Sequence, residues 1–413
     1  MLTLLAHLSL DILDVDVFRA FYVAGLGAVE DPTCSDASVL VINAGASQLR
    51  MRCGAVAQVW RGHIEMWTRE ALPRVCQRLT EQCQQVIAPM IEARQIDWTG
   101  SIELPELLDD LNGQRLLCHC PHGNTLLVRR VPPSYYIYAH GSHPGGIGGL
   151  VALTRLVHIV RPGTAAPLQA FWSHVLMASR CELVERPPVG DGPPTAHAMV
   201  RFSSGQQLIF DERVPVAGSN EAALAPAAHD SDAAYAYHIC VYLDSVDAFR
   251  TTFDACERAA VVFANPALDA SPPEEGNARC WAEAEAAGQF RIKDMLTALP
   301  DDDEQPVNPD GSRPVALVLE VAVRSVAHRK CPLPRADIVA GGAQVEPPPA
   351  FAGCSPLIPP PHSKPGMIRI PHGRGGFGEA ARALAREKAA REKAASQPSN
   401  GNAFSSPAAA RYR

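Results

Sequence analysis

The chain has 413 residues, of which 47% are hydrophobic and 20% charged, so it is long enough for two or three domains with cores of their own. No stretch approaches the ~18 consecutive apolar residues of a membrane helix, and the first ten residues lack the cationic flank of a secretory signal, so a cytoplasmic protein without membrane contact is expected. The net charge is −7, although residues 345–413 hold ten Lys or Arg against four Asp or Glu. The remainder is therefore acidic, which disfavours nucleic-acid binding.

The first predicted element is a strand over residues 7–12, in which apolar and polar residues alternate. It leads into a helix whose apolar face is formed by Phe18, Phe21 and Tyr22, with Asp16 as the expected N-cap. The glycines of residues 25–27 end this helix. A strand followed by a helix is thus the first local unit of the chain.

Three further units repeat this pattern. Their strands are expected at residues 62–67, 156–160 and 237–242, each followed by apolar residues at helical spacing. Short strands are predicted after the four helices, at residues 39–42, 48–51, 115–120, 125–129, 198–202, 207–210, 289–292 and 315–323. The repeat of strand, helix and two or three antiparallel strands predicts an α+β fold in which two successive repeats pair into one domain.

Composition sets the expected domain boundaries. Residues 1–134 form the first domain, the Gly-rich segment 135–150 is a linker and residues 151–332 form the second domain. Residues 333–413 are rich in Pro and then in Ala, Arg, Glu and Lys, which predicts a disordered or helical tail. Leu384 is the only large apolar residue of its charged run, so this run is expected to stay solvated; docking to an acidic partner is the alternative.

Several short motifs give the chain a resemblance to the vicinal oxygen chelate superfamily, which includes glyoxalase I, bleomycin-resistance proteins and extradiol dioxygenases. The resemblance covers roughly residues 1–330. The residues that carry it are His7–Tyr22 with Gly25–Gly27, Gly62-His63-Ile64, Cys120–Asn124, Arg161–Ala165, Tyr237-His238-Ile239 and Val323-Arg324-Ser325.

This resemblance implies tandem paired βαβββ modules, each pair enclosing a cavity. Family members bind a divalent metal there with side chains from the first and last strands of each module. A metal with open positions lets a substrate with two adjacent oxygens chelate it. Zn, Fe, Ni and Mn all remain open as the metal.

In the first domain, His7 and His63 occupy the first-strand positions that the resemblance implies. The last-strand positions fall on Arg50, or its neighbour Gln48, and on Leu127, and neither Arg nor Leu binds a cation. We therefore expect a metal-free cavity lined by His7, Arg50 and His63. If Arg50 points inward, this cavity favours an anionic ligand.

The second domain has more candidate ligands. Glu320 lies in an otherwise apolar strand, where an ionised carboxylate is costly unless it is paired or bound to a metal. Together with His158, Glu212 and His238 it matches a glyoxalase-type set of two His and two Glu, and without Glu212 the two-His, one-carboxylate set of iron dioxygenases. Counting by strand register places the first-strand position at Val157, one residue before His158.

The resemblance therefore predicts a metal-dependent enzyme, either a glyoxalase-like lyase or isomerase or a ring-cleaving dioxygenase, that acts on a small oxygen-rich substrate in the second domain. Glu212 or Glu320 would also serve as general base. The alternative is a non-catalytic protein that sequesters a ligand, as resistance proteins do. In that case His7 and His63 are polar cavity residues and His158 is a core histidine. The sequence leaves the oligomeric state open.

Overall fold

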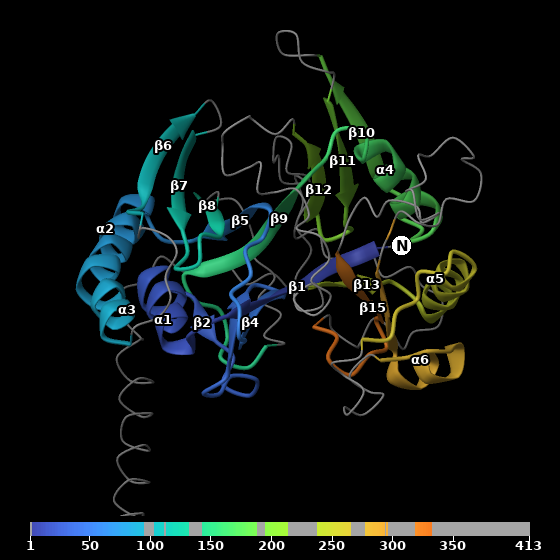
Figure 1. Cartoon of the computed structure of the whole chain (residues 1–413), viewed down its shortest axis with the longest axis horizontal. Helices are drawn as coiled ribbons and strands as arrows, with labels where there is room; N and C mark the ends of the chain where they lie inside the picture. Colours follow the sequence, from blue (N-terminus) through green and yellow to red (C-terminus); the bar gives the residue numbers. More distant parts are fainter. Residues whose placement is uncertain are drawn as a thin grey trace, which may run out of the picture. The chain divides into compact units, whose positions relative to one another are not determined.

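The computed structural model describes residues 2–94, 103–110, 113–131, 143–187, 195–213, 238–265, 277–293, 295 and 319–332 (Figure 1). The predicted tail, residues 333–413, lies outside these residues, as do residues 315–318 of the last predicted strand.

Four modules follow one another along the chain, as the sequence repeat predicts. The first consists of β1 (Leu2–Ile12), α1 (Val15–Arg19), η1 (Ala20–Gly25), β2 (Val29–Glu30), β3 (Val39–Ala44) and β4 (Ser47–Cys53). The second consists of β5 (Gly62–Thr68), α2 (Leu72–Gln82), η2 (Cys83–Ile87), α3 (Ala88–Arg94), β6 (Glu106–Asp110), β7 (Gly113–His119) and β8 (Thr125–Arg130).

The third module has the same plan, and the fourth differs in that a second helix follows the first and an isolated bridge, Val262 to Ile292, stands where the others have a strand. The third consists of β9 (Leu150–Val160), α4 (Ala165–His174), β10 (Cys181–Arg186), β11 (Thr195–Arg201) and β12 (Gln207–Glu212). The fourth consists of β13 (His238–Leu243), α5 (Val246–Arg258), α6 (Trp281–Ala287), β14 (Gln289–Ile292) and β15 (Glu320–Ser325). An α+β fold of tandem βαβββ modules is therefore confirmed.

The first helix forms for the reason the sequence indicates, but it begins earlier. Phe18, Phe21 and Tyr22 are each 1% exposed and form its buried face. The N-cap is Asp14, whose carboxylate accepts hydrogen bonds from the backbone N–H groups of Asp16 and Val17. The prediction of Asp16 as N-cap is wrong, because Asp14 has the extended backbone that a cap requires.

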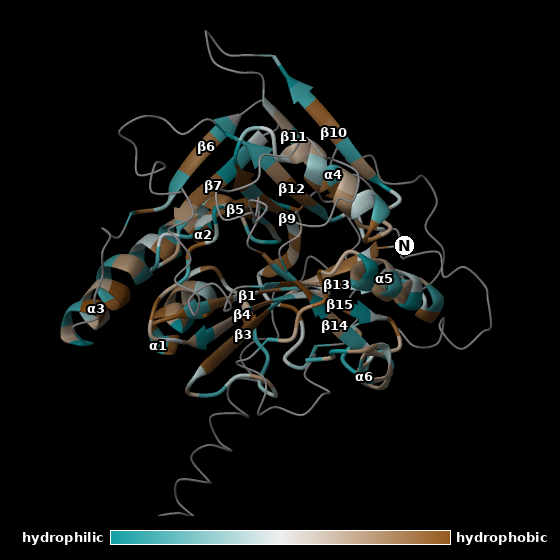
Figure 2. Ribbon diagram, turned by 45° about the vertical axis from the view of Figure 1, so that its right-hand side comes forward, coloured by the Kyte–Doolittle hydropathy of each residue, from teal (hydrophilic) through white to brown (hydrophobic). Residues whose placement is uncertain are grey.

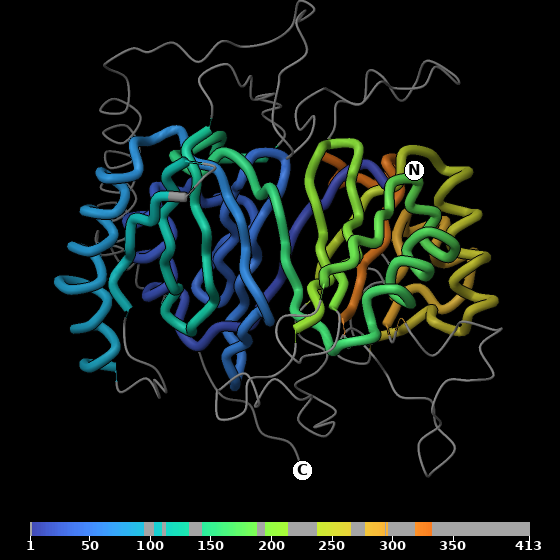
Figure 3. Tube along the Cα trace, turned by 90° about the horizontal axis from the view of Figure 1, so that it is seen from above, coloured from blue at the N-terminus to red at the C-terminus, as the bar shows by residue number. Residues whose placement is uncertain are grey.

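The modules pair differently from the expected order. The seven-stranded sheet has the order β14-β15-β13-β1-β4-β3-β2 and joins the first module to the fourth through β1 and β13. The eight-stranded sheet has the order β10-β11-β12-β9-β5-β8-β7-β6 and joins the second module to the third through β5 and β9. Seen from above, the first two modules lie on one side and the last two on the other, and both sheets cross the middle (Figure 3).

One face of each sheet packs into a continuous apolar core. This face carries residues such as Leu8, Ile64, Leu156, Ile239 and Val321, all fully buried in one cluster. At the edge of the larger sheet, apolar and polar bands alternate along the mostly exposed strand β10 (Figure 2). A smaller, separate apolar cluster on the seven-stranded sheet is formed by Leu4, Ala6, Cys240, Tyr242 and Ala322.

The Gly-rich segment before β9 is held by hydrogen bonds over its described part, residues 143–149. The N–H of Gly149 donates to the carbonyl of Gly27 at 2.6 Å, and the side chain of Asn43 donates to the carbonyl of Pro144 at 2.9 Å. A Cβ atom at Gly148 would lie 2.6 Å from the same Gly27 carbonyl oxygen, which explains the glycine. The domain boundary here stays a prediction.

Candidate functional site

Two histidines from distant parts of the sequence meet on the seven-stranded sheet, on the face opposite Leu8 and Ile239. His7 lies on β1 and His238 begins β13, and their Nε2 atoms are 3.3 Å apart. A bulge in β1 between Leu5 and His7 sets two residues of β1 against one of β13. Bulges of this kind redirect side chains and are frequent beside active sites.

Both imidazoles are neutral at pH 7. Burial lowers the pKa of His7 and of His238 well below 6.5, and the positive charges of Arg50, Arg291 and Arg324 lower it further. A neutral imidazole with a free lone pair is the form that binds a metal or accepts a proton.

Each histidine has a counterpart on the last strand of its module. In the parallel pair β1 and β4, His7 is opposite Gln48, and in the parallel pair β13 and β15, His238 is opposite Glu320. Cross-strand neighbours share one face of a sheet, about 4.8 Å apart. The first and fourth modules therefore each bring one imidazole and one oxygen-bearing side chain to the same face.

The two oxygen-bearing side chains already have partners. Gln48 donates to Asp31 at 2.9 Å and to Asn43 at 3.1 Å, and its carbonyl oxygen accepts a hydrogen bond from Arg50 at 2.7 Å. The carboxylate of Glu320 forms a buried ion pair with Arg291 and accepts a hydrogen bond from Asn265 at 3.1 Å. Burial raises the pKa of Glu320, while Arg291 and Asn265 oppose the rise.

The donor set fits a divalent ion in part. Two nitrogens bound to one ion at ~2.1 Å, with a bond angle between about 90° and 109°, lie ~3.0–3.4 Å apart, and the His7–His238 separation falls in this range. Within the described ranges, no group of three or more His, Cys, Asp or Glu is placed to hold a metal. A third protein ligand requires Glu320 to leave Arg291, or Gln48 to leave Arg50.

His158 does not join this site, because it lies in the other sheet and on its core face. The register sets His158 opposite Gly62 and Val157 opposite His63, so Val157 shares the face of His63. The ring of His158 packs edge to face against Trp60 at 4.8 Å, and burial lowers its pKa to about 4. The predicted ligand position was thus one residue out of register.

Glu212 also stays in the eight-stranded sheet. Its Oε1 accepts a hydrogen bond from the N–H of Ala165 at 2.7 Å, and its Oε2 accepts one from the N–H of Ala196 at 2.8 Å. Glu212 therefore satisfies the first backbone donor of α4 and ties this helix to β11. The structure brings His238 and Glu320 together, and it places His158 and Glu212 elsewhere.

The predicted first-domain cavity is likewise divided between the two sheets. His7 and Arg50 lie on the seven-stranded sheet with His238. His63 lies on the eight-stranded sheet, where its Nε2 is 3.3 Å from Glu65, which also pairs with Arg155 at 2.9 Å. The expectation of one cavity for His7, Arg50 and His63 is wrong, because the first module pairs with the fourth rather than with the second.

Sequence reasoning missed Arg291 and Asn265, and it named Arg324 only as part of a motif and not as a residue of the site. Arg291 and Arg324 show the signal that identified Glu320, a charged residue within a short apolar strand, and both are 7% exposed. Nothing in the local sequence distinguishes Asn265 from a loop residue.

Comparison with known proteins finds only distant similarity to solved structures. No protein-family model matches the chain, and no curated protein sequence matches it significantly. Among solved structures, a glyoxalase I mutant from Zea mays is similar over 78% of this chain and 94% of its own, at 11% identity and a TM-score of 0.36. A glyoxalase-related enzyme from Fulvimarina pelagi covers 36% of this chain and 99% of its own, at 16% identity and a TM-score of 0.24. These values carry no argument about activity.

The four modules share one pattern of strand pairing. In all four modules the first strand lies parallel to the last, as β1 does to β4, β5 to β8, β9 to β12 and β13 to β15. The first strands of two modules then pair antiparallel in each sheet. Paired βαβββ modules are the arrangement that the resemblance to the vicinal oxygen chelate superfamily predicts. None of its described helices is long and apolar enough to cross a membrane.

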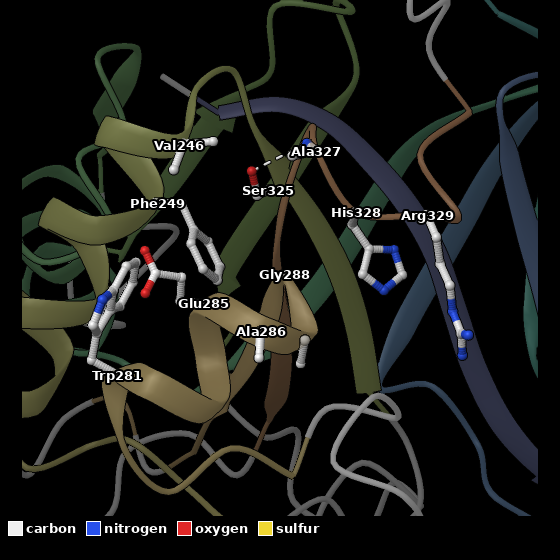
Figure 4. A pocket seen from close by; sticks show the side chains of 11 residues that line it. Val246, Phe249, Trp281, Glu285, Ala286, Gly288, Ser325, Ala327, His328 and Arg329 are labelled. Atoms are coloured by element: carbon white, nitrogen blue, oxygen red, sulfur yellow. Dashed lines mark hydrogen bonds between the residues drawn. The ribbon is translucent and has the colours of Figure 1, made fainter.

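A cavity of about 370 Å³ lies beside α5 and α6 (Figure 4). Phe249 and Trp281 line it from α5 and α6, and His328 lines it from the segment after β15. The Nδ1 atom of His328 is 3.5 Å from the hydroxyl of Tyr242. Glu285, Ser325 and Arg329 also line the cavity, so its wall is partly polar and holds a single histidine.

Proposed function

We propose that the chain is a divalent-metal-dependent enzyme that acts on a small oxygen-rich substrate, as a lyase or isomerase of the glyoxalase kind or as a ring-cleaving dioxygenase. The observation that carries the proposal is the 3.3 Å separation of the Nε2 atoms of His7 and His238 on neutral, converging imidazoles. The site differs from the expected second-domain site, since the first module supplies one of its histidines.

The roles of the side chains follow from their contacts. His7 and His238 would hold the ion, and Glu320 or Gln48 would complete its ligands from the adjacent last strands. A bound divalent ion would polarise a carbonyl oxygen of the substrate. Glu320 would accept or return the substrate proton, because burial brings its pKa closer to neutrality, and Arg291 would hold it when it carries charge.

Metal binding tests the proposal directly. The protein should be stripped with EDTA, dialysed against Zn²⁺, Ni²⁺, Mn²⁺ or Fe²⁺ in turn and analysed for bound metal. About one ion per chain is expected, with an affinity at least ~10-fold lower in His7→Ala and in His238→Ala. His63→Ala is the matched control, since His63 is also a first-strand histidine but lies in the other sheet. Retention of the ion by both single variants, or loss of it in the control, would contradict the proposal.

Oxygen uptake distinguishes the two reaction classes within the proposal. A ring-cleaving dioxygenase consumes O₂ with its substrate, whereas a lyase or isomerase does not.

Non-catalytic sequestration of a ligand is the second candidate. It is favoured by the hydrogen bonds that already engage Gln48 and both oxygens of Glu320, because these leave two imidazoles as the available donors. If wild-type protein binds none of the four metals while a ligand occupies the same face, this second candidate replaces the first.

A further inference from the structure

Two arginines beside the histidine pair have neutral partners. Arg50 donates from Nε and Nη2 to the side-chain Oε1 of Gln48, at 3.2 and 2.7 Å. Arg324 donates from Nε to the side-chain Oε1 of Gln289 at 2.8 Å, and its guanidinium lies 6.0 Å from the ring centre of Tyr242. Over the part of the chain that the structure describes, no carboxylate pairs with either guanidinium.

These charges are close enough to repel each other. Burial lowers the pKa of Arg50, and the charge of Arg324 lowers it further. Burial, Arg50 and Arg324 together lower the pKa of Lys330, which stands exposed at the rim of the same face. The charges of Arg50 and Arg324 both act on His7, and Arg324 is only 7% exposed.

The nearby acids are engaged elsewhere. Glu320 pairs with Arg291, and Asp31 accepts hydrogen bonds from Gln48 and from the backbone and hydroxyl of Thr33. Burying like charges without a counter-charge lowers the stability of a fold, so an anion that binds between these charges should raise it. The glutamine side chains engage Nε and Nη2 of Arg50 and Nε of Arg324, so an oxyanion would bind to the remaining N–H groups of the two guanidiniums.

We propose that Arg50, Arg324 and Lys330 bind an anionic oxygen group, a carboxylate or a phosphate, of the molecule that occupies the face beside His7 and His238. This inference deepens the proposed function, on which it rests for the identity of that molecule as substrate. The anion itself is bound by the arginines, with or without metal.

Thermal unfolding with two small probe anions tests this site. Wild-type protein in EDTA should show a rise in Tm with inorganic phosphate, with acetate or with both, relative to chloride at the same ionic strength. A response to one anion alone identifies the group as phosphate or carboxylate. Arg50→Met and Arg324→Met should each weaken the apparent affinity about 10-fold or more, since each removes charge-assisted hydrogen bonds.

Arg52→Met is the matched control. Arg52 lies on β4 two residues beyond Arg50, but its side chain is 56% exposed and pairs with Asp11 at 3.3 Å. Its substitution should change anion affinity by less than about 2-fold. Without added anion, Arg50→Met should unfold at the wild-type temperature or above it, because burial and the charge of Arg324 lower the pKa of Arg50. A cooperative unfolding transition of Arg324→Met shows that this variant folds as well.

The outcomes separate this inference from the proposed function. Wild-type protein that responds to neither anion, or arginine variants that respond as the wild type does, would overturn the anion site even if the histidines bind metal. Anion binding in EDTA that depends on Arg50 and Arg324 supports the site even if metal binding fails.

Discussion

His7 and His238 are 231 residues apart in sequence, and their Nε2 atoms are 3.3 Å apart. Each half of the chain supplies one of these imidazoles, and each half also supplies strands to both sheets. The candidate site therefore depends on the two halves remaining together.

We predict that cutting the chain between its halves leaves them associated. A protease site inserted within residues 132–142 would break one peptide bond and leave the β1–β13 and β5–β9 ladders intact. The two fragments should elute as one species in size-exclusion chromatography under native conditions and separate in urea. Two separate folded species under native conditions would instead support independent domains.

His158→Phe should leave the candidate site unchanged and reduce the acid sensitivity of the fold. Burial lowers the pKa of His158 to about 4, whereas it is ~6.5 in the unfolded chain, so between these values the unfolded state binds a proton that the folded state does not. Stability should therefore fall as pH decreases from 6.5 to 4, by up to about 3 kcal/mol for this residue.

Urea unfolding of wild-type protein and His158→Phe at pH 7, 5.5 and 4 measures this difference. As pH decreases, the free energy of unfolding of wild-type protein should fall more than that of His158→Phe. The amount of metal bound at pH 7 should be equal in the two proteins. A constant difference across the three pH values would show that His158 has the same pKa in the folded and unfolded states.

Glu212→Ala should destabilise the fold by about 1–3 kcal/mol, because the buried N–H groups of Ala165 and Ala196 lose their acceptor. Glu212→Gln should recover part of this loss, since the amide oxygen can accept one of the two bonds. Chemical denaturation gives both values. If Glu212→Gln folds but no longer binds metal, Glu212 is a metal ligand after all.

Glu320 and Arg291 should behave as a coupled pair. Glu320→Gln or Arg291→Met alone should lower the free energy of unfolding by about 3–5 kcal/mol, because each removes one charge of a buried ion pair and leaves the other charge buried. The double variant should cost less than the sum of the two. A double-mutant cycle measured in urea gives the coupling, and additive single effects would mean that the pair contributes nothing to stability.

The sequence predicted the modules, because the helical face of Phe18, Phe21 and Tyr22 and the alternation along the strands are local features. It did not predict which modules pair. The antiparallel contact between β1 and β13 bridges more than 200 residues, and hydrophobic periodicity contains no record of strand partners. For the same reason the sequence predicted that His7 shares a cavity with His63, whereas it lies beside His238.

The site was predicted in part, and the errors have physical causes. Glu320 was found because a carboxylate in an apolar strand needs a partner, but this reasoning does not distinguish a metal from Arg291. His158 was assigned to the cavity although an adjacent position in a strand faces the opposite side of the sheet. The predicted tail lies outside the described residues and stays a prediction.

The central position of β1 in its sheet has a consequence for biosynthesis. The eight-stranded sheet has all its strands once residue 212 has been made, but β1 waits for β13, which begins at residue 238. At ~5–20 residues per second the ribosome needs roughly 10–50 s to make the intervening chain. During this interval one edge of β1 lacks its partner, and residues 2–6 of this strand are apolar except for Thr3. The nascent chain is then open to pairing with another strand, and protection by a chaperone would matter most before residue 243 emerges.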